Sequence, residues 1–377
     1  MKTQPDIKKV EWFRQYLSVF LPFALVLVVG FLAHYYTIHQ TERVTLEADE
    51  LLNIGLARSV LNSDLTNVIT DLLFLANYLE TRVFEQSGLP HRVVIRQLFY
   101  TFAREKRLYD QIRLLDPEGR EQVRVNFVHG EPQLVSDERL QDKASRYYFR
   151  EAMRLQPGEI YISPLDLNIE QGEIEQPLKP VMRFAIPLFD GKGQKQGILV
   201  LNYLGKRLLD NFARAGANIA DHIHLLNSEG YWLSSPDKGD EWGFLRNHAR
   251  RFQDLYPEAW ARIEQGVSGQ FTNQQGLFSF ETVTPNSVAS QIMDARQPQA
   301  PSISTDAYRW KVVSRVAPDR VAPGPVVFLR QHLPLYLTIV VSLLFGSWLL
   351  TTANSIGSRP RSPPCAAIAG RSPTSWR

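Results

Sequence analysis

Residues 112–119 read IRLLDPEG, and residues 223–230 repeat the phrase as IHLLNSEG. Five of the eight positions are identical, and Asp116 is replaced by the similar Asn227. Each copy begins with strand formers, passes through a polar turn that ends in Gly, and continues into a second alternating segment, which is typical of a β-hairpin. The repeat therefore predicts that one structural module occurs twice in the chain.

The segments that follow the two hairpins agree in their order. EAMRLQPGEIYIS (151–163) and EAWARIEQGVSGQFT (258–272) both run from a helical pattern through Gly into a strand. Two further strands are expected in each half, at 181–189 and 197–204, then at 277–285 and 308–316. We therefore predict two tandem α+β modules joined by a helical linker near 205–221, with a polar, mobile loop over 287–305.

Two apolar segments are long enough to span a membrane. Residues 17–38 and 333–353 contain no Lys, Arg, Asp or Glu, and about 20 apolar residues cross the hydrocarbon core. Basic residues precede the first segment and follow the second, which predicts an inner-membrane protein with two spans, both termini in the cytoplasm and the region between outside. A cleaved signal peptide is the alternative for the first segment, but no small-residue cleavage site is evident.

The segment after the first span predicts a long helix. Apolar residues from Leu51 to Leu79 recur at steps of three and four, interrupted once by Arg58, which is typical of one buried helix face. This face packs against its own modules or against a second copy in a parallel homodimer. The predicted organisation is a cytoplasmic N-terminus (1–16), span (17–38), long helix (39–86), membrane-distal module (87–205), membrane-proximal module (206–320), span (333–353) and basic disordered tail (354–377).

Composition and motifs argue against several classes of protein. The net charge of +3 arises largely from the two ends of the chain, and no nucleic-acid-binding motif is present, so we expect no nucleic-acid partner. The single cysteine, Cys365, excludes an intrachain disulfide. His222 and His224 would share one strand face but have no evident third ligand, so we expect no metal and no cofactor. We find no P-loop and no nucleophile elbow, and we predict that the chain is not an enzyme.

The stretches YDQIRLLDPEGREQVRVN (109–126), LQDKASRYYFREAM (140–153), EIYISPLDLNIEQGEIEQPLKPVMRFAIPLFD (159–190) and GILVLNYLG (197–205) resemble a known family. They are similar to the double Cache, or tandem PAS-like, sensor regions of bacterial transmembrane receptors, most closely those fused to diguanylate cyclases or histidine kinases. The resemblance covers about residues 39–320 and is more specific for the distal module. It implies antiparallel sheets with flanking helices on a long N-terminal helix. It also implies an extracytoplasmic sensor whose distal module binds a small molecule.

Candidate ligand-binding residues cluster in the distal module. Many relatives bind amino acids or carboxylates through an Arg-x-Trp-Tyr pattern, to which Arg146, Tyr148 and Phe149 correspond here with both aromatics changed. Arg can hold two carboxylate oxygens, and aromatic neighbours supply a rigid wall. The remaining candidates are a Tyr, an Asp and two strand arginines: Tyr161, Asp166, Arg113 and Arg183. The alternative for each is a solvated arginine or a core aromatic. The two changed aromatics argue against an amino-acid ligand and do not exclude a carboxylate.

The tail after the second span shows no helical periodicity. Residues 354–377 are rich in Arg, Ser, Pro and Ala, and such a composition does not bury a core. We expect that the reading frame is lost near Ile356, which would leave a receptor without its cyclase or kinase output domain. The alternative is a short basic tail on anionic membrane lipid.

These observations lead to one predicted function and two rivals. We predict a membrane-bound signal-transduction sensor that binds a small extracytoplasmic ligand through its distal module. One rival is a complete two-span binding subunit that signals through a separate membrane partner. The other, a membrane-anchored enzyme, would need a catalytic constellation that the sequence does not display.

Overall fold

A computed structural model describes residues 7–84, 91–170, 173–246, 250–296, 308–321 and 324–357 of the chain. The chain divides into two compact units, one of Val44–Val321 and the other of Met1–Arg43 together with Ala322–Arg377. Helix α1 (Ile7–Tyr78) belongs to both units and ends in a turn of π-helix, η1 (Leu79–Phe84). The predicted basic tail lies almost wholly outside the described residues.

The smaller unit consists of the first part of α1 with α9 (Pro325–Gln331) and α10 (Leu333–Gly357). Helices at Lys9–Phe84 and Leu333–Asn354 are long and apolar enough to cross a membrane. Aromatic side chains join them, because the ring of Phe31 lies 5.0 Å from that of Tyr336. His34 Nδ1 also lies 2.7 Å from the Tyr336 hydroxyl.

The distal module is built on a seven-stranded antiparallel sheet in the order β3-β2-β1-β9-β8-β4, with β5 also paired to β8. The strands are β1 (Tyr109–Leu115), β2 (Glu121–Val128), β3 (Glu131–Leu134), β4 (Tyr161–Ile162), β5 (Asp166–Leu167), β8 (Pro180–Phe189) and β9 (Lys195–Leu204). A separate hairpin contains β6 (Ile169–Glu170) and β7 (Glu173–Ile174). The helical elements are α2 (His91–Lys106), the 3₁₀ turn η2 (Asp137–Arg139) and α3 (Tyr147–Arg154).

The proximal module repeats this plan with a five-stranded sheet in the order β11-β10-β14-β13-β12. Its strands are β10 (Ile223–Leu226), β11 (Trp232–Ser234), β12 (Ser268–Asn273), β13 (Gly276–Val283) and β14 (Trp310–Val316). Its helices are α5 (Phe252–Leu255), α6 (Pro257–Gln265), α7 (Pro285–Arg296) and α8 (Pro318–Val321). The linker is α4 (Gly205–Ala215) with the 3₁₀ turn η3 (Ala217–Ile219).

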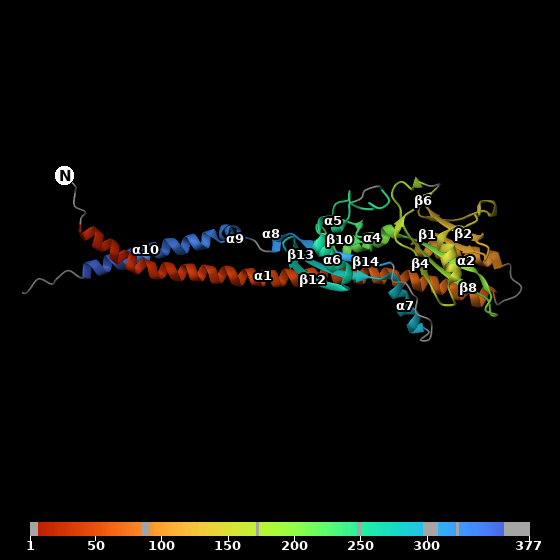
Figure 1. Cartoon of the computed structure of the whole chain (residues 1–377), viewed down its shortest axis with the longest axis horizontal. Coiled ribbons are helices and arrows are strands. Elements are labelled where there is room, and N and C mark those ends of the chain that lie inside the picture. The colour runs from red at the N-terminus through yellow and green to blue at the C-terminus, as the bar shows by residue number, and fades with distance from the viewer. Residues whose placement is uncertain are drawn as a thin grey trace, which may run out of the picture. The chain divides into compact units, whose positions relative to one another are not determined.

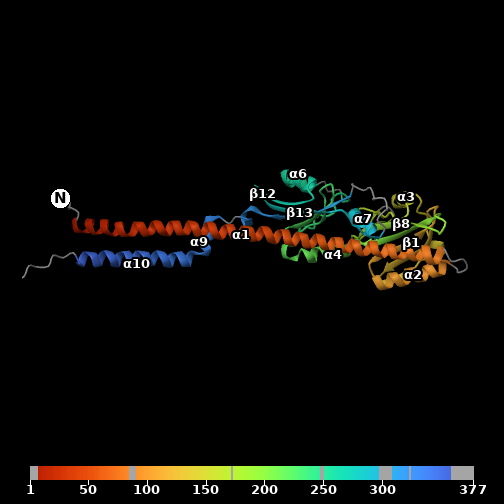
Figure 2. The ribbon, with the colours of Figure 1, turned by 90° about the horizontal axis from the view of Figure 1, so that it is seen from below.

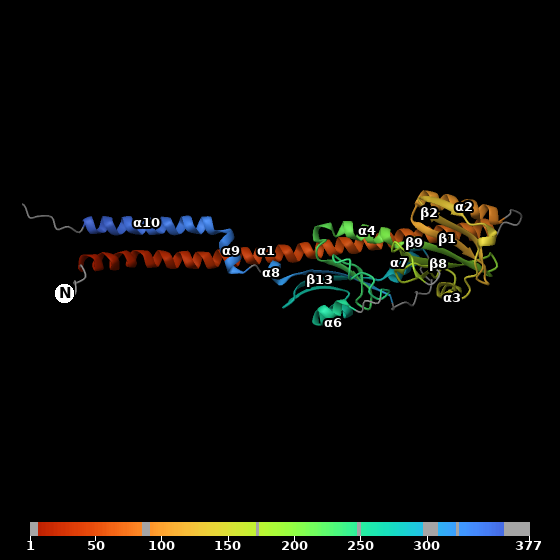
Figure 3. The same ribbon diagram turned by 90° about the horizontal axis from the view of Figure 1, so that it is seen from above.

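The larger unit is organised around α1, which runs past both sheets (Figure 1). Helices α2 and α3 lie on opposite faces of the distal sheet, and α4 and β13 lie on opposite sides of α1 (Figures 2 and 3). One face of each sheet therefore packs towards α1, and the other face points away from this helix.

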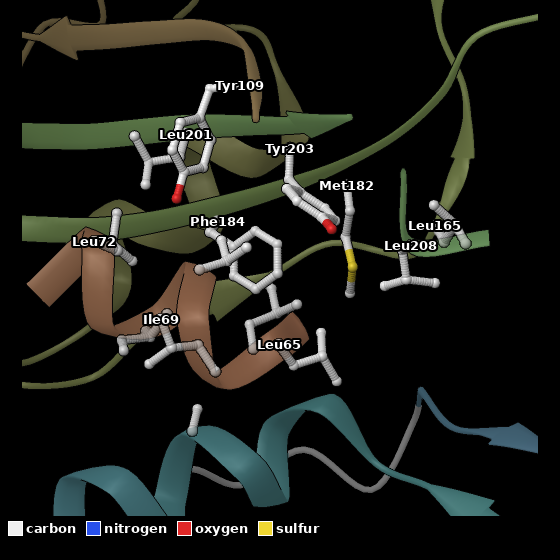
Figure 4. Close-up of a cluster of buried hydrophobic side chains, with 14 of the residues drawn as sticks. Leu65, Ile69, Leu72, Tyr109, Leu165, Met182, Phe184, Leu201, Tyr203 and Leu208 are labelled. Carbon is white, nitrogen blue, oxygen red and sulfur yellow. The ribbon is translucent and has the colours of Figure 1, made fainter. Parts of the chain in front are cut away.

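The apolar stripe predicted on α1 packs against its own modules. Seven of its members are at most 1% exposed: Ile54, Leu61, Leu65, Val68, Leu72, Leu75 and Leu79. Leu65, Ile69 and Leu72 face Phe184, Leu201 and Tyr203 of the distal sheet (Figure 4). Leu51, in contrast, is 41% exposed. Burial of this stripe fixes α1 to the sheets, because each fully buried Leu or Ile contributes about 1.5–3 kcal/mol.

The repeated phrase forms the same turn twice. Asp116 Oδ1 accepts hydrogen bonds from the backbone N–H groups of Glu118 and Arg120, at 3.1 and 2.8 Å. Asn227 Oδ1 accepts the equivalent bonds from Glu229 and Tyr231, at 3.0 and 2.9 Å. The glycine of each turn has a positive φ, 89° at residue 119 and 83° at residue 230, which glycine adopts without steric cost. The repeat predicted from the sequence is therefore a repeat of structure.

One sequence prediction is wrong. The segment expected to be a polar loop begins as helix α7, which covers Pro285–Arg296. Pro285 suits the first helical turn, and Val288, Ala289 and Met293 are at most 7% exposed in the core shared with α1. The rest of that predicted loop, from residue 297 onward, lies outside the described residues.

Candidate functional site

A polar cavity of about 270 Å³ lies on the face of the distal sheet that points away from α1. We call it the distal pocket. Strands β1, β2, β8 and β9 form its floor, and the segment before α3 and the segment around β5 form its walls. Its cationic lining residues are Arg113, Arg124, Lys143, Arg146 and Arg183.

Strand alternation directs Arg113 into the pocket. Its neighbours Ile112 and Leu114 belong to the core shared with α1, so the side chain between them points to the opposite face. Arg113 is 4% exposed and donates hydrogen bonds to the Tyr148 hydroxyl at 2.8 Å and to Asn202 Oδ1 at 2.6 Å. The guanidinium is thus held rigidly by β9 and α3 together.

A buried carboxylate balances part of this charge. Glu121 Oε2 accepts a hydrogen bond from Arg124 Nη1 at 2.8 Å, and Glu121 Oε1 lies 3.8 Å from Arg113 Nη1. Arg113 and Arg124 are directly paired across β1 and β2, so their charges lie side by side. The Nε atoms of both arginines are buried without a hydrogen-bond acceptor. One carboxylate therefore serves two guanidiniums.

Arg183 occupies the opposite wall. Its Nη1 lies 3.2 Å from the Tyr147 hydroxyl and 3.4 Å from Asp166 Oδ1, and its side chain is 13% exposed. Burial raises the pKa of Asp166, and the charge and hydrogen bond of Arg183 only partly offset that effect. The Arg183–Asp166 contact is a long ion pair.

Helix α3 begins beside the pocket at Arg146, which is its N-terminal cap residue. The ring of Tyr148 lies between two guanidiniums, 5.2 Å from that of Arg113 and 5.9 Å from that of Arg183. The Arg146 side chain is exposed and has no hydrogen-bond or ion-pair partner within the described part of the chain. Arg146 is therefore a free cation at the entrance.

The pocket carries an excess of positive charge. Five cationic side chains line it, while Asp166 and Glu121 are the carboxylates that contact them. Burial, followed by the neighbouring charge of Arg113, lowers the pKa of Lys143. Like charges held together in this way create a positive potential in the cavity.

Residues 59–293 match the family model of the bacterial histidine kinase sensor domain. The chain belongs to this family. Among curated proteins, no relative matches the sensor. Solved structures of bacterial sensor domains share its fold.

The first is a domain of a sensory box/GGDEF family protein from Vibrio parahaemolyticus. It is 18% identical to the sensor, with a TM-score of 0.55, and the match covers 74% of this chain and 99% of that one. The second is the extracellular domain of vpHK1S-Z8, named as a histidine kinase, at 20% identity and a TM-score of 0.52, covering 71% of this chain and 93% of that one. The tandem PAS-like Cache fold predicted for the sensor is confirmed.

The distal pocket brings together five of the seven candidate residues named from the sequence: Arg113, Arg146, Tyr148, Asp166 and Arg183. Phe149 and Tyr161 do not line it, because both pack in the apolar cluster around Leu115 and Ile198. Ligand binding by the five stays a prediction.

Sequence reasoning missed Arg124 and Lys143. The alternation of β2 contains a usable signal, since Val123 and Val125 are buried towards α1 and Arg124 must then share the face of Arg113. Lys143 lies in irregular backbone before α3, where no periodicity indicates its direction.

The corresponding face of the proximal sheet is filled by aromatic side chains. Trp232, Phe252, Trp260, Phe278 and Phe280 form one cluster there, each at most 6% exposed. The prediction that His222 and His224 point to one face is wrong. His222 lies before the strand and contacts Glu50 of α1, whereas His224 contacts Trp232 and Phe252. No metal-binding cluster occurs among the residues described.

Proposed function

We propose that the distal pocket of this sensor binds a small organic anion with at least two carboxylates. The observation that carries the proposal is the excess of cations over carboxylates around the cavity. Buried charges are costly unless they are balanced, so a cavity with more cationic side chains than carboxylates is best explained by an anionic ligand. The exposed side chain of Arg146, which has no partner among the described residues, is the donor most accessible to it.

Binding would link the two walls of the pocket. A carboxylate held by Arg113 and Arg183 on the sheet leaves a second carboxylate near Arg146 and Lys143, which precede α3. The ligand would therefore favour conformations in which the segment before α3 is close to the sheet. Arg is suited to this role because its planar donors hold two oxygens at once.

The same proposal includes the membrane topology and the assembly. The helices at Lys9–Phe84 and Leu333–Asn354 would cross the inner membrane, with the distal module (87–205) and proximal module (206–320) on the extracytoplasmic side and both termini in the cytoplasm. Exposed apolar residues on α1, among them Val44 and Leu52 at 62% and 72% exposure, support a homodimer along this helix. The output that the sensor controls would be a histidine kinase or diguanylate cyclase, as the resemblance implies.

The test is a titration of the detergent-solubilised full chain with succinate, L-malate and citrate, followed by thermal shift and calorimetry. We expect at least one of these anions to stabilise the protein and acetate to have a much smaller effect. Arg146→Ala should weaken binding about tenfold or more, as expected for the loss of one charge-assisted contact. The apo protein should keep its stability, because Arg146 is exposed and unpaired in the described region.

Arg150→Ala is the matched control. Arg150 lies one turn further along α3, is also exposed and does not line the pocket. Its replacement removes the same charge from the same helix and should leave the affinity unchanged. Equal losses in both variants would show a non-specific charge effect, and no binding of any of the three anions would refute the proposed ligand class.

A further inference from the structure

The proximal module contains a second polar cavity, of about 290 Å³, at the end of its sheet. We call it the proximal cleft. It is bounded by Arg58 and Asn62 of α1, by the α6–β12 connection, by α7 and by the adjacent ends of β13 and β14. No member of the aromatic cluster on the outer sheet face lines it, but the two adjoin, because Lys311 Nζ lies 6.0 Å from the centre of the Phe280 ring.

A buried lysine forms part of the wall of this cleft. Lys311 on β14 is 1% exposed, and its Nζ donates to the Gly266 carbonyl at 2.6 Å and to Thr282 Oγ1 at 2.8 Å. An ammonium group has three donors, and the third finds no acceptor among the residues described. No described carboxylate forms an ion pair with it either. A buried ammonium with only neutral partners is an unusual arrangement.

The charges around Lys311 do not neutralise it. Arg309 also lines the cleft and is exposed at its rim, while Arg58 is paired with Glu281. Burial lowers the pKa of Lys311 to about 8. The positive charge of Arg309 also lowers this pKa, and the negative charge of Glu264 partly offsets both effects. The lysine therefore remains mostly protonated at neutral pH, and the protein retains a cation that destabilises it.

Neutral hydrogen-bonding groups complete the wall. The side chains of Asn62, Gln265, Ser287 and Gln291 line the cleft beside the two unpaired cations. Hydroxyl groups match such amides and hydroxyls, because both can donate and accept. The smaller positive excess, compared with the distal pocket, favours a ligand with a single negative charge.

We propose that the proximal cleft binds a small hydroxycarboxylate, with its carboxylate at Lys311 and Arg309 and its hydroxyl groups at the neighbouring amides. Such a ligand bridges Asn62 of α1 and Lys311 of the proximal sheet. It stabilises the arrangement of α1 against this module and so acts as a second input, independent of the distal pocket.

The experiment uses the full chain carrying Arg146→Ala, so that the distal pocket is weakened, with D-glycerate, L-lactate and glycolate as probes. Glycerol and inorganic phosphate are the comparison compounds. We expect at least one hydroxycarboxylate to raise the melting temperature of this variant, glycerol to have no comparable effect, and added Lys311→Met to lower the affinity about tenfold or more. Arg309→Ala, at the exposed rim, should lower it as well.

Two controls separate binding from a structural role for Lys311. Lys238→Met removes an exposed lysine from the same module outside the cleft and should leave the affinity unchanged. Without ligand, Lys311→Met should melt at or above the parent temperature, because Met fills similar space and removes a buried charge. A clear drop in apo stability, a thermal shift that survives Lys311→Met, a response to phosphate alone, or no response to any hydroxycarboxylate would each overturn the proposal.

Discussion

The two modules use one topology for opposite purposes on their outer sheet faces. In the distal module, Arg113, Arg124 and Arg183 project from this face into a cavity. In the proximal module, aromatic residues such as Phe278 and Trp260 fill the equivalent face. The strand pairing is alike, since β1 with β2 and β9 corresponds to β10 with β11 and β14.

This difference indicates how a duplicated module divides its tasks. Burying charged side chains on a sheet face destabilises the fold, and a bound ligand of opposite charge offsets this cost. A face covered by aromatic side chains stabilises the fold and packs the sheet tightly against its helices. The distal module is therefore suited to recognition. The proximal module is suited to carrying a change along α1 without deforming.

The largest change in the free energy of unfolding is expected when an aromatic side chain is removed from the outer face of the proximal sheet. Phe278→Ala removes a side chain that is 0% exposed, so the free energy of unfolding should fall by about 3–5 kcal/mol. Arg146→Ala, on the distal side, should change it by no more than about 0.5 kcal/mol. Denaturant unfolding of the full chain measures both, with Phe278→Leu as a milder control. Similar losses in both variants would contradict the division between a structural face and a binding face.

The sequence predicts the hairpins and strand faces of the two modules better than it predicts the contacts within the distal pocket. Local signals suffice for the hairpins, because Asp116 and Asn227 act within four residues of themselves. The face of Arg113 follows from the alternation of β1. The hydrogen-bond partners of Arg113 cannot be predicted in this way. Asn202 is 89 positions away in the chain and lies beside Arg113 because β1 pairs with β9.

Helix rotation explains why Phe149 misses the distal pocket, whereas Tyr161 lies on β4 and packs in the same apolar cluster. Adjacent helical residues differ by about 100° around the axis. Tyr147 and Tyr148 line the pocket, and Phe149, one step further round, packs in the apolar cluster instead. His222 does not follow the alternation of β10, because it precedes the first residue of that strand. Its side chain is instead oriented by the contact with Glu50 of α1.

An effect of intermediate size is expected at the polar contacts that attach each module to α1. The distal attachment joins Tyr109 and Lys106 to Asp71, at 2.6 and 2.7 Å. The proximal attachment joins His222 Nε2 to Glu50 Oε1 at 2.9 Å, with Ser314 on the other oxygen of Glu50. Burial lowers the pKa of His222, but Glu50 and Asp221 outweigh it and raise the pKa above the ordinary value of 6.5.

A raised pKa makes the proximal attachment sensitive to pH. The stabilisation is fully present below pH 6.5 and is lost as the pH rises through the higher pKa of the folded protein. Hydrogen exchange, corrected for its intrinsic pH dependence, should therefore show falling protection of α1 near Glu50 above pH 6.5 and constant protection near Asp71. His222→Gln should abolish this pH response. An equal decline at both positions would point to a general loosening of α1 instead.

The smallest effect is expected at the two copies of the repeated turn. Asp116→Ala and Asn227→Ala each remove an oxygen that accepts two backbone N–H groups, so each should cost about 1 kcal/mol in unfolding free energy. Asn227 is 8% exposed and Asp116 is only half-buried, so water replaces the lost acceptor less well in the proximal turn. Asn227→Ala should therefore be the more damaging change. Asp116→Asn keeps the acceptor of the turn but replaces the Oδ2 that accepts from Gln122 Nε2 at 2.7 Å, so it should cost less than Asp116→Ala. The opposite ranking would mean that the charge of Asp116 stabilises its turn more than burial stabilises the other.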